Sequence, residues 1–138
     1  MTGSMQSDER KGTGRKTVRV VLADDHKILR SGMCGLLESE PGIEVVAQAE
    51  DGRTAVRLCR EHRPDVVLMD ISMHDMNGIE ATRQIRNIRK DIPIIAQTAF
   101  IFEDDKDIIL EAGCDACLIK PIRKDHLLTV MSSFLKSV

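Results

Sequence analysis

Four groups of polar residues in this chain each follow a short apolar run, and their types suit phosphoryl-transfer chemistry. If the apolar runs are neighbouring parallel strands, their carboxyl ends lie along one edge of a single sheet. Carboxylates, a hydroxyl and an amine gathered at such an edge can hold a divalent cation and a phosphoryl group. In chain order these groups are Asp24 with Asp25, Asp70, Thr98, and Lys120 before Pro121.

The acidic residues are candidate metal ligands, and one of them is a candidate nucleophile. Adjacent carboxylates such as those of Asp24 and Asp25 repel each other unless a cation lies between them. Mg²⁺ suits this position because it takes carboxylate and water oxygens. Asp70 follows a fully apolar run, and a carboxylate placed there can attack phosphorus to form an aspartyl-phosphate. Two solvated loop acids and a turn-capping aspartate are the ordinary alternatives.

The amine and the hydroxyl are candidate phosphate-binding groups. Lys120 can neutralise phosphoryl oxygens as a point charge, and Thr98 can donate its hydroxyl to one of them. Taken singly, Lys120-Pro121 is also compatible with an ordinary turn after a strand, and Thr98 with the start of a turn. The order of all the groups together, rather than any one of them, indicates a site.

From Thr17 onward, short β-branched runs alternate with amphipathic stretches. The pattern predicts five strands, near residues 17–23, 44–49, 65–69, 93–97 and 115–119. It predicts five helices, over residues 26–39, 52–62, 78–89, 103–112 and 124–137. This alternation is typical of an α/β fold with a doubly wound parallel sheet and helices on both faces.

Two predicted helices carry distinct apolar stripes, and a third has a cap signal. The stripe of the first helix consists of Ile28, Leu29, Gly32, Leu36 and Leu37. The last helix has the best match to a buried helical face, formed by Leu127, Leu128, Met131, Phe134 and Leu135. Gly113 suits a left-handed cap at the end of the fourth helix.

The composition excludes several classes of protein. With 138 residues, 42% of them hydrophobic and 30% charged, the chain fits one soluble globular domain. No apolar stretch reaches the ~20 residues of a membrane span, and none follows the N-terminus as a secretory signal would. The net charge of −2 gives no electrostatic footprint for nucleic acid. Because no secretory signal is seen in the sequence, the four cysteines are expected to be reduced thiols, which indicates a cytoplasmic location.

Residues 1–16 are polar and lack periodicity. We expect them to be disordered, either as a natural tail or as a remnant of expression. A single domain is expected over residues 17–138. Because no output domain follows it in this sequence, a stand-alone protein is favoured over an excised piece.

From about Thr17 to Val138 the chain resembles a response-regulator receiver domain of two-component signalling. The matching residues are the acidic pair Asp24-Asp25, Asp70 within Leu-Met-Asp-Ile-Ser-Met-His-Asp-Met-Asn-Gly, Thr98-Ala99, and Lys120-Pro121. Gly78 and the Glu-Ala-Gly-Cys-Asp stretch before the last strand match as well.

The resemblance implies a flavodoxin-like fold with strand order 2-1-3-4-5. It also implies that Asp70 accepts a phosphoryl group from a histidine kinase or a histidine phosphotransfer protein. A cis peptide bond before Pro121 is typical of the family. The implied ligands of Mg²⁺ are Asp24, Asp25, Asp70 and the backbone carbonyl of Ser72.

In the same family, Lys120 and Thr98 would bind the phosphoryl oxygens. Phosphorylation would change the surface of the fourth helix, the fifth strand and the fifth helix. The chain would catalyse only its own phosphorylation and dephosphorylation, and would not be an enzyme acting on an outside substrate. We expect a monomer or weak homodimer that binds neither nucleic acid nor membrane, with a downstream effector protein that the sequence does not name.

Several residues depart from the family pattern. Cys117 occupies a position where most receivers have Tyr or Phe, which puts the usual coupling to Thr98 in doubt. His74 replaces a proline that is common after the phosphorylated aspartate, and Phe100 is placed to shield the phosphoryl group from water. Cys114 and Cys117 form a C-x-x-C spacing that can bind metal or undergo redox cycling, but two small buried apolar residues are the favoured interpretation.

Two other functions compete with the phosphoryl-accepting switch. One is a receiver-like protein-interaction module that acts without phosphorylation, and the loss of the aromatic residue at position 117 favours it weakly. The other is a phosphohydrolase with an aspartate nucleophile. Those enzymes need a second acid two residues after the first, and Ser72 in that position nearly excludes them.

Overall fold

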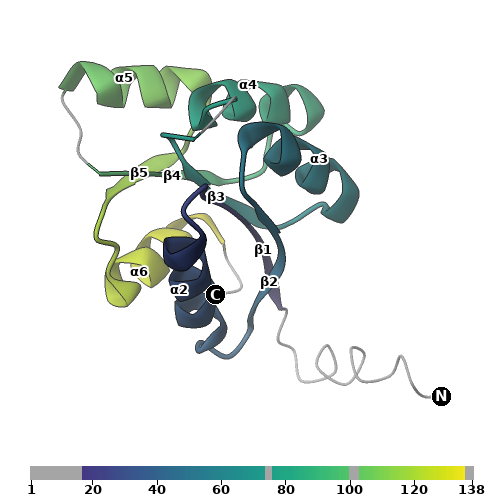
Figure 1. The fold of residues 1–138 in the computed structure, drawn as a ribbon, viewed down its shortest axis with the longest axis vertical. Helices are drawn as coiled ribbons and strands as arrows, with labels where there is room; N and C mark the ends of the chain where they lie inside the picture. Colours follow the sequence, from purple (N-terminus) through teal and green to yellow (C-terminus); the bar gives the residue numbers. More distant parts are fainter. Residues whose placement is uncertain (1–16, 74–75, 100–102, 136–138) are drawn as a thin grey trace.

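The computed structural model describes residues 17–73, 76–99 and 103–135, in which strands and helices alternate (Figure 1). The predicted tail 1–16, His74 and Phe100 lie outside the described residues. The strands are β1 (Val18–Ala23), β2 (Ile43–Ala49), β3 (Val66–Asp70), β4 (Ile94–Thr98) and β5 (Ala116–Ile119). The helices are α2 (Lys27–Glu38), α3 (Gly52–His62), α4 (Gly78–Ile88), α5 (Glu103–Ala112) and α6 (Lys124–Phe134).

The five strands pair in parallel in the order β2-β1-β3-β4-β5, which confirms the predicted topology. β3 and β4 lie inside the sheet and are buried along their whole length. Their continuous apolar runs follow from this position, because a strand covered by helices on both faces has no solvent-facing side. The winding of the chain reverses between β1 and β3, where the sequence places Asp24 and Asp70.

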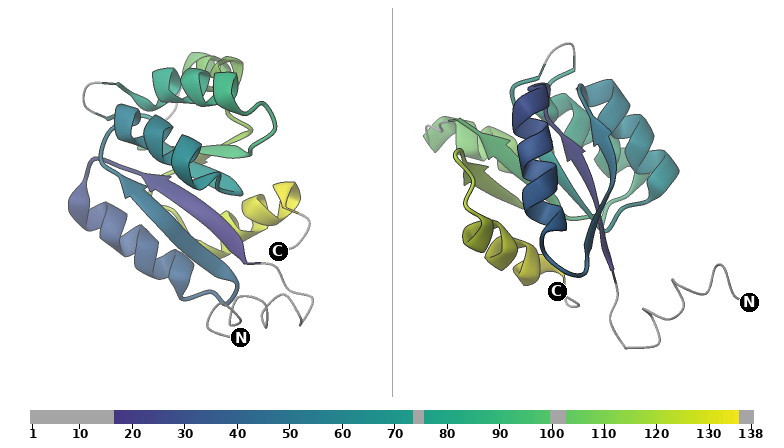
Figure 2. Two further views of the ribbon diagram at one scale, coloured as in Figure 1. Left: turned by 90° about the vertical axis from the view of Figure 1, so that its right-hand side faces the viewer. Right: turned by 60° about the horizontal axis from the view of Figure 1, so that its bottom comes forward.

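Helices cover both faces of the sheet, and each face has its own hydrophobic core. Helices α3, α4 and α5 pack on one face, where Ile85 and Ile109 are buried. Helices α2 and α6 pack on the other, where Leu37, Leu127 and Met131 are buried. Figures 1 and 2 show this three-layer arrangement. Across the described ranges, no helix is both long and apolar enough to cross a membrane.

Local signals set the ends of several helices. The side chain of Asp51 accepts a hydrogen bond from the Thr54 N–H at 2.8 Å and caps α3. Asn77 caps α4 in the same way, through the N–H of Glu80 at 3.0 Å. Gly113 follows α5 with φ of 118°, which confirms the predicted left-handed cap.

The predicted apolar stripes are only partly buried. Leu37 is fully buried, but Ile28 is 85% exposed and Leu29 is 52% exposed. These two residues lie in the first turn of α2, which lines a surface pocket instead of packing on the sheet. In α6, Leu127 and Met131 are buried. Phe134 is 38% exposed, because it is the last residue of the helix and lies outside the core cluster. The periodicity therefore identifies the apolar face but not how far along the helix the core extends.

All four cysteines are free thiols in the structure. Desolvation by burial raises the pKa of Cys59 to about 12 and that of Cys114 to about 11. The Cys114 sulfur lies 3.6 Å from the hydroxyl of Thr82. Cys117 is half-buried and packs against the core formed with α3, α4 and α5. These contacts favour packing over redox chemistry for the C-x-x-C pair.

We expect Cys59 and Cys114 to resist thiol reagents in the native protein at about pH 8. Only the thiolate reacts, and each unit of pKa above the working pH lowers the thiolate fraction about tenfold. A variant carrying Cys34→Ala and Cys117→Ala isolates the two buried thiols. Their reaction with Ellman's reagent should be at least about 100-fold slower in the folded protein than in urea. Equal rates in the two states would contradict the packing role.

Candidate functional site

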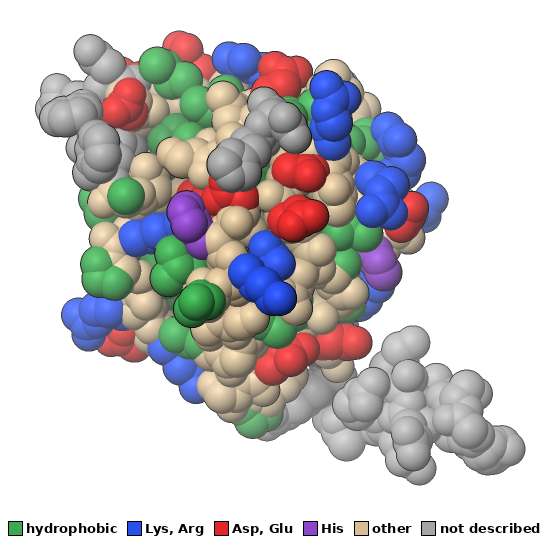
Figure 3. All heavy atoms as spheres, viewed as in Figure 1, with side chains coloured by type: hydrophobic (Ala, Val, Ile, Leu, Met, Phe, Trp, Pro, Cys, Tyr) green, Lys and Arg blue, Asp and Glu red, His purple; other side chains and the backbone are tan. Residues whose placement is uncertain are grey.

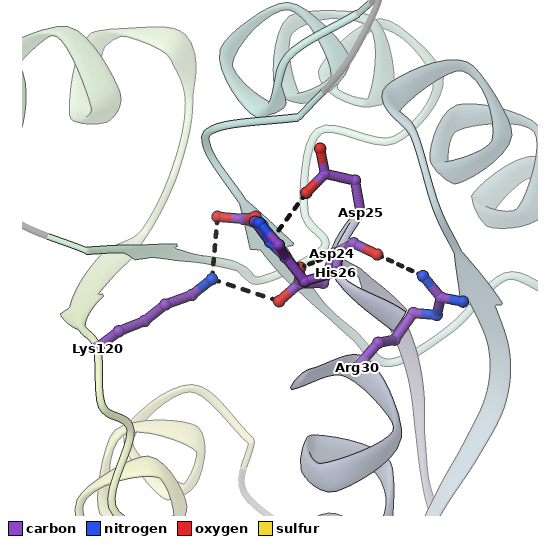
Figure 4. Close-up of polar contacts among 6 residues, drawn as sticks. Asp24, Asp25, His26, Arg30 and Lys120 are labelled. Atoms are coloured by element: carbon purple, nitrogen blue, oxygen red, sulfur yellow. Dashed lines mark hydrogen bonds and ion pairs between the residues drawn. The ribbon is translucent and has the colours of Figure 1, made fainter. Parts of the chain in front are cut away.

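Lys120 lies between two buried carboxylates at the carboxyl edge of the sheet. Its Nζ atom is 3.3 Å from Oδ2 of Asp24 and 3.4 Å from Oδ1 of Asp70. Asp24 is 3% exposed and Asp70 is 2% exposed. Figure 4 shows the Lys120 side chain reaching from the end of β5 toward Asp24. Groups that are far apart in the sequence therefore meet at one point.

The pairing of the strands explains why these side chains converge. β1 and β3 pair in a register that brings the following residues, Asp24 and Asp70, to adjacent positions. The Lys120 N–H donates to the Thr98 carbonyl oxygen at 2.7 Å, which fixes the backbone of Lys120 beside the end of β4. The Lys120–Pro121 peptide bond is cis, as the resemblance implies.

Asp24 is held in place through both its backbone and its carboxylate. Its N–H donates to the Ala49 carbonyl at 3.0 Å, and its own carbonyl accepts from Nη1 of Arg30 at 2.6 Å. Oδ1 of Asp24 accepts the backbone N–H of His26 at 2.8 Å. The carboxylate that faces Lys120 is therefore preorganised, and its orientation does not depend on the ion pair alone.

The environment of Asp70 disfavours its ionised form. Burial raises the pKa of this carboxyl group above its ordinary value; the Lys120 ammonium opposes the increase, and the nearby Asp24 carboxylate adds to it. An anion in such a position is stabilised by anything that neutralises it. Binding of a divalent cation does so.

The carboxylates fit a divalent cation. Asp24, Asp25, His26 and Asp70 each offer one ligand atom, and these atoms lie within 4.8 Å of one another. Oδ2 of Asp70 is buried and has no hydrogen-bond partner in the part of the chain that the structure describes. A buried carboxylate oxygen without a partner, next to two further carboxylates, is a group that Mg²⁺ would satisfy.

Thr98 and Ser72 lie at the same edge of the sheet. Thr98 is the last residue of β4, is 9% exposed, and lines a pocket of about 240 Å³ together with Ser72 and Ile108 of α5. Ser72 follows Asp70 by two residues and is exposed. The role of the Thr98 hydroxyl in phosphate binding and that of the Ser72 carbonyl in metal binding stay predictions.

Sequence reasoning did not assign His26 to the site. Its Nδ1 atom lies 3.3 Å from Oδ1 of Asp24 and 3.1 Å from Oδ1 of Asp25. Its position directly after the acidic pair was the available signal, but adjacency in a loop does not determine where a ring points. Figure 3 shows histidine, acidic and basic side chains meeting on this face of the molecule.

A pocket of about 460 Å³ lies beside the charged groups. Ile28, Leu29 and Met33 of α2 form one wall, and Asp24 and Lys120 also line it. The exposed apolar residues of α2 therefore adjoin the cluster of charges.

Comparison with known proteins gives the family. Residues 20–132 match the family model of the response regulator receiver domain. The chain belongs to this family. The receiver domain is similar to the transcriptional regulatory protein LiaR of Bacillus subtilis (strain 168), with 47% identity over 103 residues, 75% of this chain and 49% of LiaR. The chain spans about half the length of the curated relatives it matches.

Solved structures include similar receiver domains. A two-component response regulator of the LuxR family from Aurantimonas sp. SI85-9A1 has a TM-score of 0.81 and 36% identity, and the match covers 86% of this chain and 84% of that one. The receiver domain of the sensor histidine kinase PA1611 from Pseudomonas aeruginosa PAO1 has a TM-score of 0.79 and 30% identity, and the match covers 88% of this chain and 99% of that one. The PA1611 structure has a magnesium ion coordinated in its active site cleft.

Proposed function

We propose that this receiver domain is a phosphoryl-accepting signalling switch of a two-component phosphorelay, with Asp70 as the phosphoacceptor. The observation that carries the proposal is the position of the Lys120 ammonium, within 3.4 Å of both the Asp24 and the Asp70 carboxylates. A nucleophilic carboxylate and a cation for the transferred group are thereby placed side by side. The partially orphaned carboxylate of Asp70 adds support, because one oxygen has no hydrogen-bond partner among the described residues.

In the proposed reaction, an oxygen of the Asp70 carboxylate attacks the phosphorus of a phosphohistidine on the donor protein. The phosphorus–nitrogen bond breaks, and the donor imidazole leaves with the electron pair of that bond and takes up a proton. Lys120 neutralises charge on the phosphoryl oxygens, and the Thr98 hydroxyl donates to one of them. The chain catalyses its own phosphorylation and dephosphorylation and acts on no outside substrate.

Mg²⁺ is the proposed cofactor, and it supplies neutralising charge for the phosphoryl oxygens when bound. Its proposed ligands are Asp24, Asp25, Asp70 and the backbone carbonyl of Ser72. The magnesium ion in the active site cleft of the related PA1611 receiver domain supports the choice of Mg²⁺ as the cofactor. Arg30 and the backbone N–H of His26 hold Asp24 in the required position.

The proposed phosphodonor is a histidine kinase or a histidine phosphotransfer protein in the cytoplasm. Ile28 and Leu29 give such a partner an apolar contact surface next to Asp24. We place the response to phosphorylation on α5, β5 and α6. Ile108 of α5 and Ile119 of β5 are 44% and 53% exposed, so large apolar side chains are available there for an effector.

Chemical phosphorylation tests the proposal directly. With Mg²⁺ and acetyl phosphate, the protein should take up one phosphoryl group, and the group should map to Asp70 after reductive trapping and mass spectrometry. Backbone amide shifts should change around Asp70, Thr98 and Lys120 on addition of a beryllofluoride mimic. A chelator should prevent both effects. Absence of both labelling and shift changes would contradict the proposal and favour the alternative function, a protein-interaction module that acts without phosphorylation.

A further inference from the structure

We propose that His26 is an additional ligand of the cation at this site, and that it raises the affinity for borderline divalent cations such as Zn²⁺ and Co²⁺ over that for Mg²⁺. The inference rests on the cation site of the proposed function and concerns which cations that site selects.

The geometry places the imidazole on the same side as the carboxylates. Nδ1 lies 3.1 Å from Oδ1 of Asp25 and 3.3 Å from Oδ1 of Asp24. One ring nitrogen of His26 belongs to a group of four ligand atoms, with one oxygen each from Asp24, Asp25 and Asp70, that lie within 4.8 Å of one another. Ligand atoms bound to one cation at about 2.0–2.2 Å must lie within about 4.4 Å of one another. Small side-chain adjustments therefore allow all four atoms to reach one ion.

The backbone of His26 is fixed, so these adjustments involve only its side chain. Its N–H donates to Asp24 Oδ1 at 2.8 Å, and its carbonyl accepts the Arg30 N–H at 2.8 Å at the start of α2. The side chain itself is 63% exposed and has room to turn. Oδ2 of Asp70, in a residue that is 2% exposed, has no hydrogen-bond partner among the described residues, and a bound cation would satisfy it.

The chemistry of the donor set gives the direction of selectivity. Mg²⁺ prefers oxygen ligands and gains little from an imidazole, whereas Zn²⁺ and Co²⁺ bind imidazole nitrogen well. Three carboxylates and one imidazole form a mixed nitrogen and oxygen set of the kind found at zinc sites. Removal of the imidazole should therefore affect the two classes of cation unequally.

Cation binding would respond differently if His26 formed only an ion pair with the carboxylates and were not a ligand of the cation. If His26 only occupies the position of the cation when no ion is bound, every cation must displace it. Replacement of His26 would then strengthen the binding of Mg²⁺, Zn²⁺ and Co²⁺ by similar factors.

Calorimetric titration of the full chain with Mg²⁺, Zn²⁺ and Co²⁺ separates these cases. We expect His26→Gln to weaken Zn²⁺ and Co²⁺ binding by about tenfold or more, and to change Mg²⁺ binding by less than about twofold. The visible absorption of bound Co²⁺ should also change, because it reports the replacement of a nitrogen ligand. His126→Gln is the matched control, since His126 is exposed on α6 and belongs to no ligand group of the described residues.

Equal losses for all three cations, equal gains, or no change in the Co²⁺ spectrum would each overturn the proposal. Cation binding is read directly, so the result does not depend on whether Asp70 accepts a phosphoryl group. Conversely, failure of acetyl phosphate to label Asp70 would contradict the proposed function and leave the cation preference to be judged by titration.

Discussion

Replacement of Asp70 by asparagine should abolish phosphoryl acceptance and, in the absence of divalent cations, stabilise the fold by about 1–2 kcal/mol. Burial disfavours the charged carboxylate, and the Asp24 carboxylate adds to the penalty. Asparagine keeps the shape of the side chain and removes the charge. Lys120 keeps Asp24 as an ion-pair partner at 3.3 Å in the variant. The expected result is thus a more stable protein without a nucleophile.

Magnesium provides the internal check on this explanation. A cation that binds only the native state stabilises it according to its concentration relative to the dissociation constant. Mg²⁺ should therefore stabilise the wild-type protein more than the Asp70→Asn variant, and the difference in stability should shrink as Mg²⁺ is added. Urea unfolding with and without Mg²⁺ measures this difference.

The control for this experiment is Asp107→Asn, an identical change at an exposed position of α5. It should alter the free energy of unfolding by less than about 0.5 kcal/mol, with no dependence on Mg²⁺. An Asp70→Asn variant that is less stable than wild type without cations would show that attraction to Lys120 outweighs the desolvation of the carboxylate.

The sequence predicted the parts of the fold that depend on local periodicity and on strand ends. Parallel strands in an α/β sheet bring their carboxyl ends together, so the positions of Asp24, Asp70 and Lys120 after apolar runs were enough to predict one cluster. The element bounds were predicted to within one residue, except at the end of the last helix, which was predicted at Ser137 and lies at Phe134. Asp70 and Thr98 are the final residues of β3 and β4 rather than the residues after them.

What the sequence could not predict depends on contacts between distant elements. The apolar stripe of α2 gave no indication that Ile28 and Leu29 would remain exposed, since exposure depends on where the neighbouring β5–α6 connection lies. The position of the His26 ring depends on the orientation of the Asp25 carboxylate beside it. The hydrophobic periodicity likewise does not predict where two backbone segments come close together. The close approach of Gly78 to the backbone of Asp70 and Ile71 has the largest expected effect on stability.

The substitution Gly78→Ala should destabilise the protein by about 2–4 kcal/mol and impair phosphorylation at Asp70. A Cβ atom at Gly78 would overlap the backbone carbonyl oxygen of Asp70 and lie 2.9 Å from the Cα of Ile71. Both neighbours are backbone atoms, so neither can move aside by a change of rotamer. The Gly78 N–H also donates to the Ile71 carbonyl at 3.0 Å, which holds the two segments together.

Gly35→Ala is the matched control, because a Cβ atom there meets no atom within 4 Å and the residue lies inside α2. Alanine at this exposed helical position should stabilise the protein by about 0.5–1 kcal/mol, through its higher helix propensity. The same chemical change is therefore expected to have opposite signs at the two positions. Urea unfolding measures the stabilities, and the rate of labelling by acetyl phosphate measures the effect on the site. If Gly78→Ala had the same free energy of unfolding as the wild type, the backbone of the β3–α4 connection would be able to shift at little energetic cost. The position of Asp70 would then not depend on its contact with the start of α4.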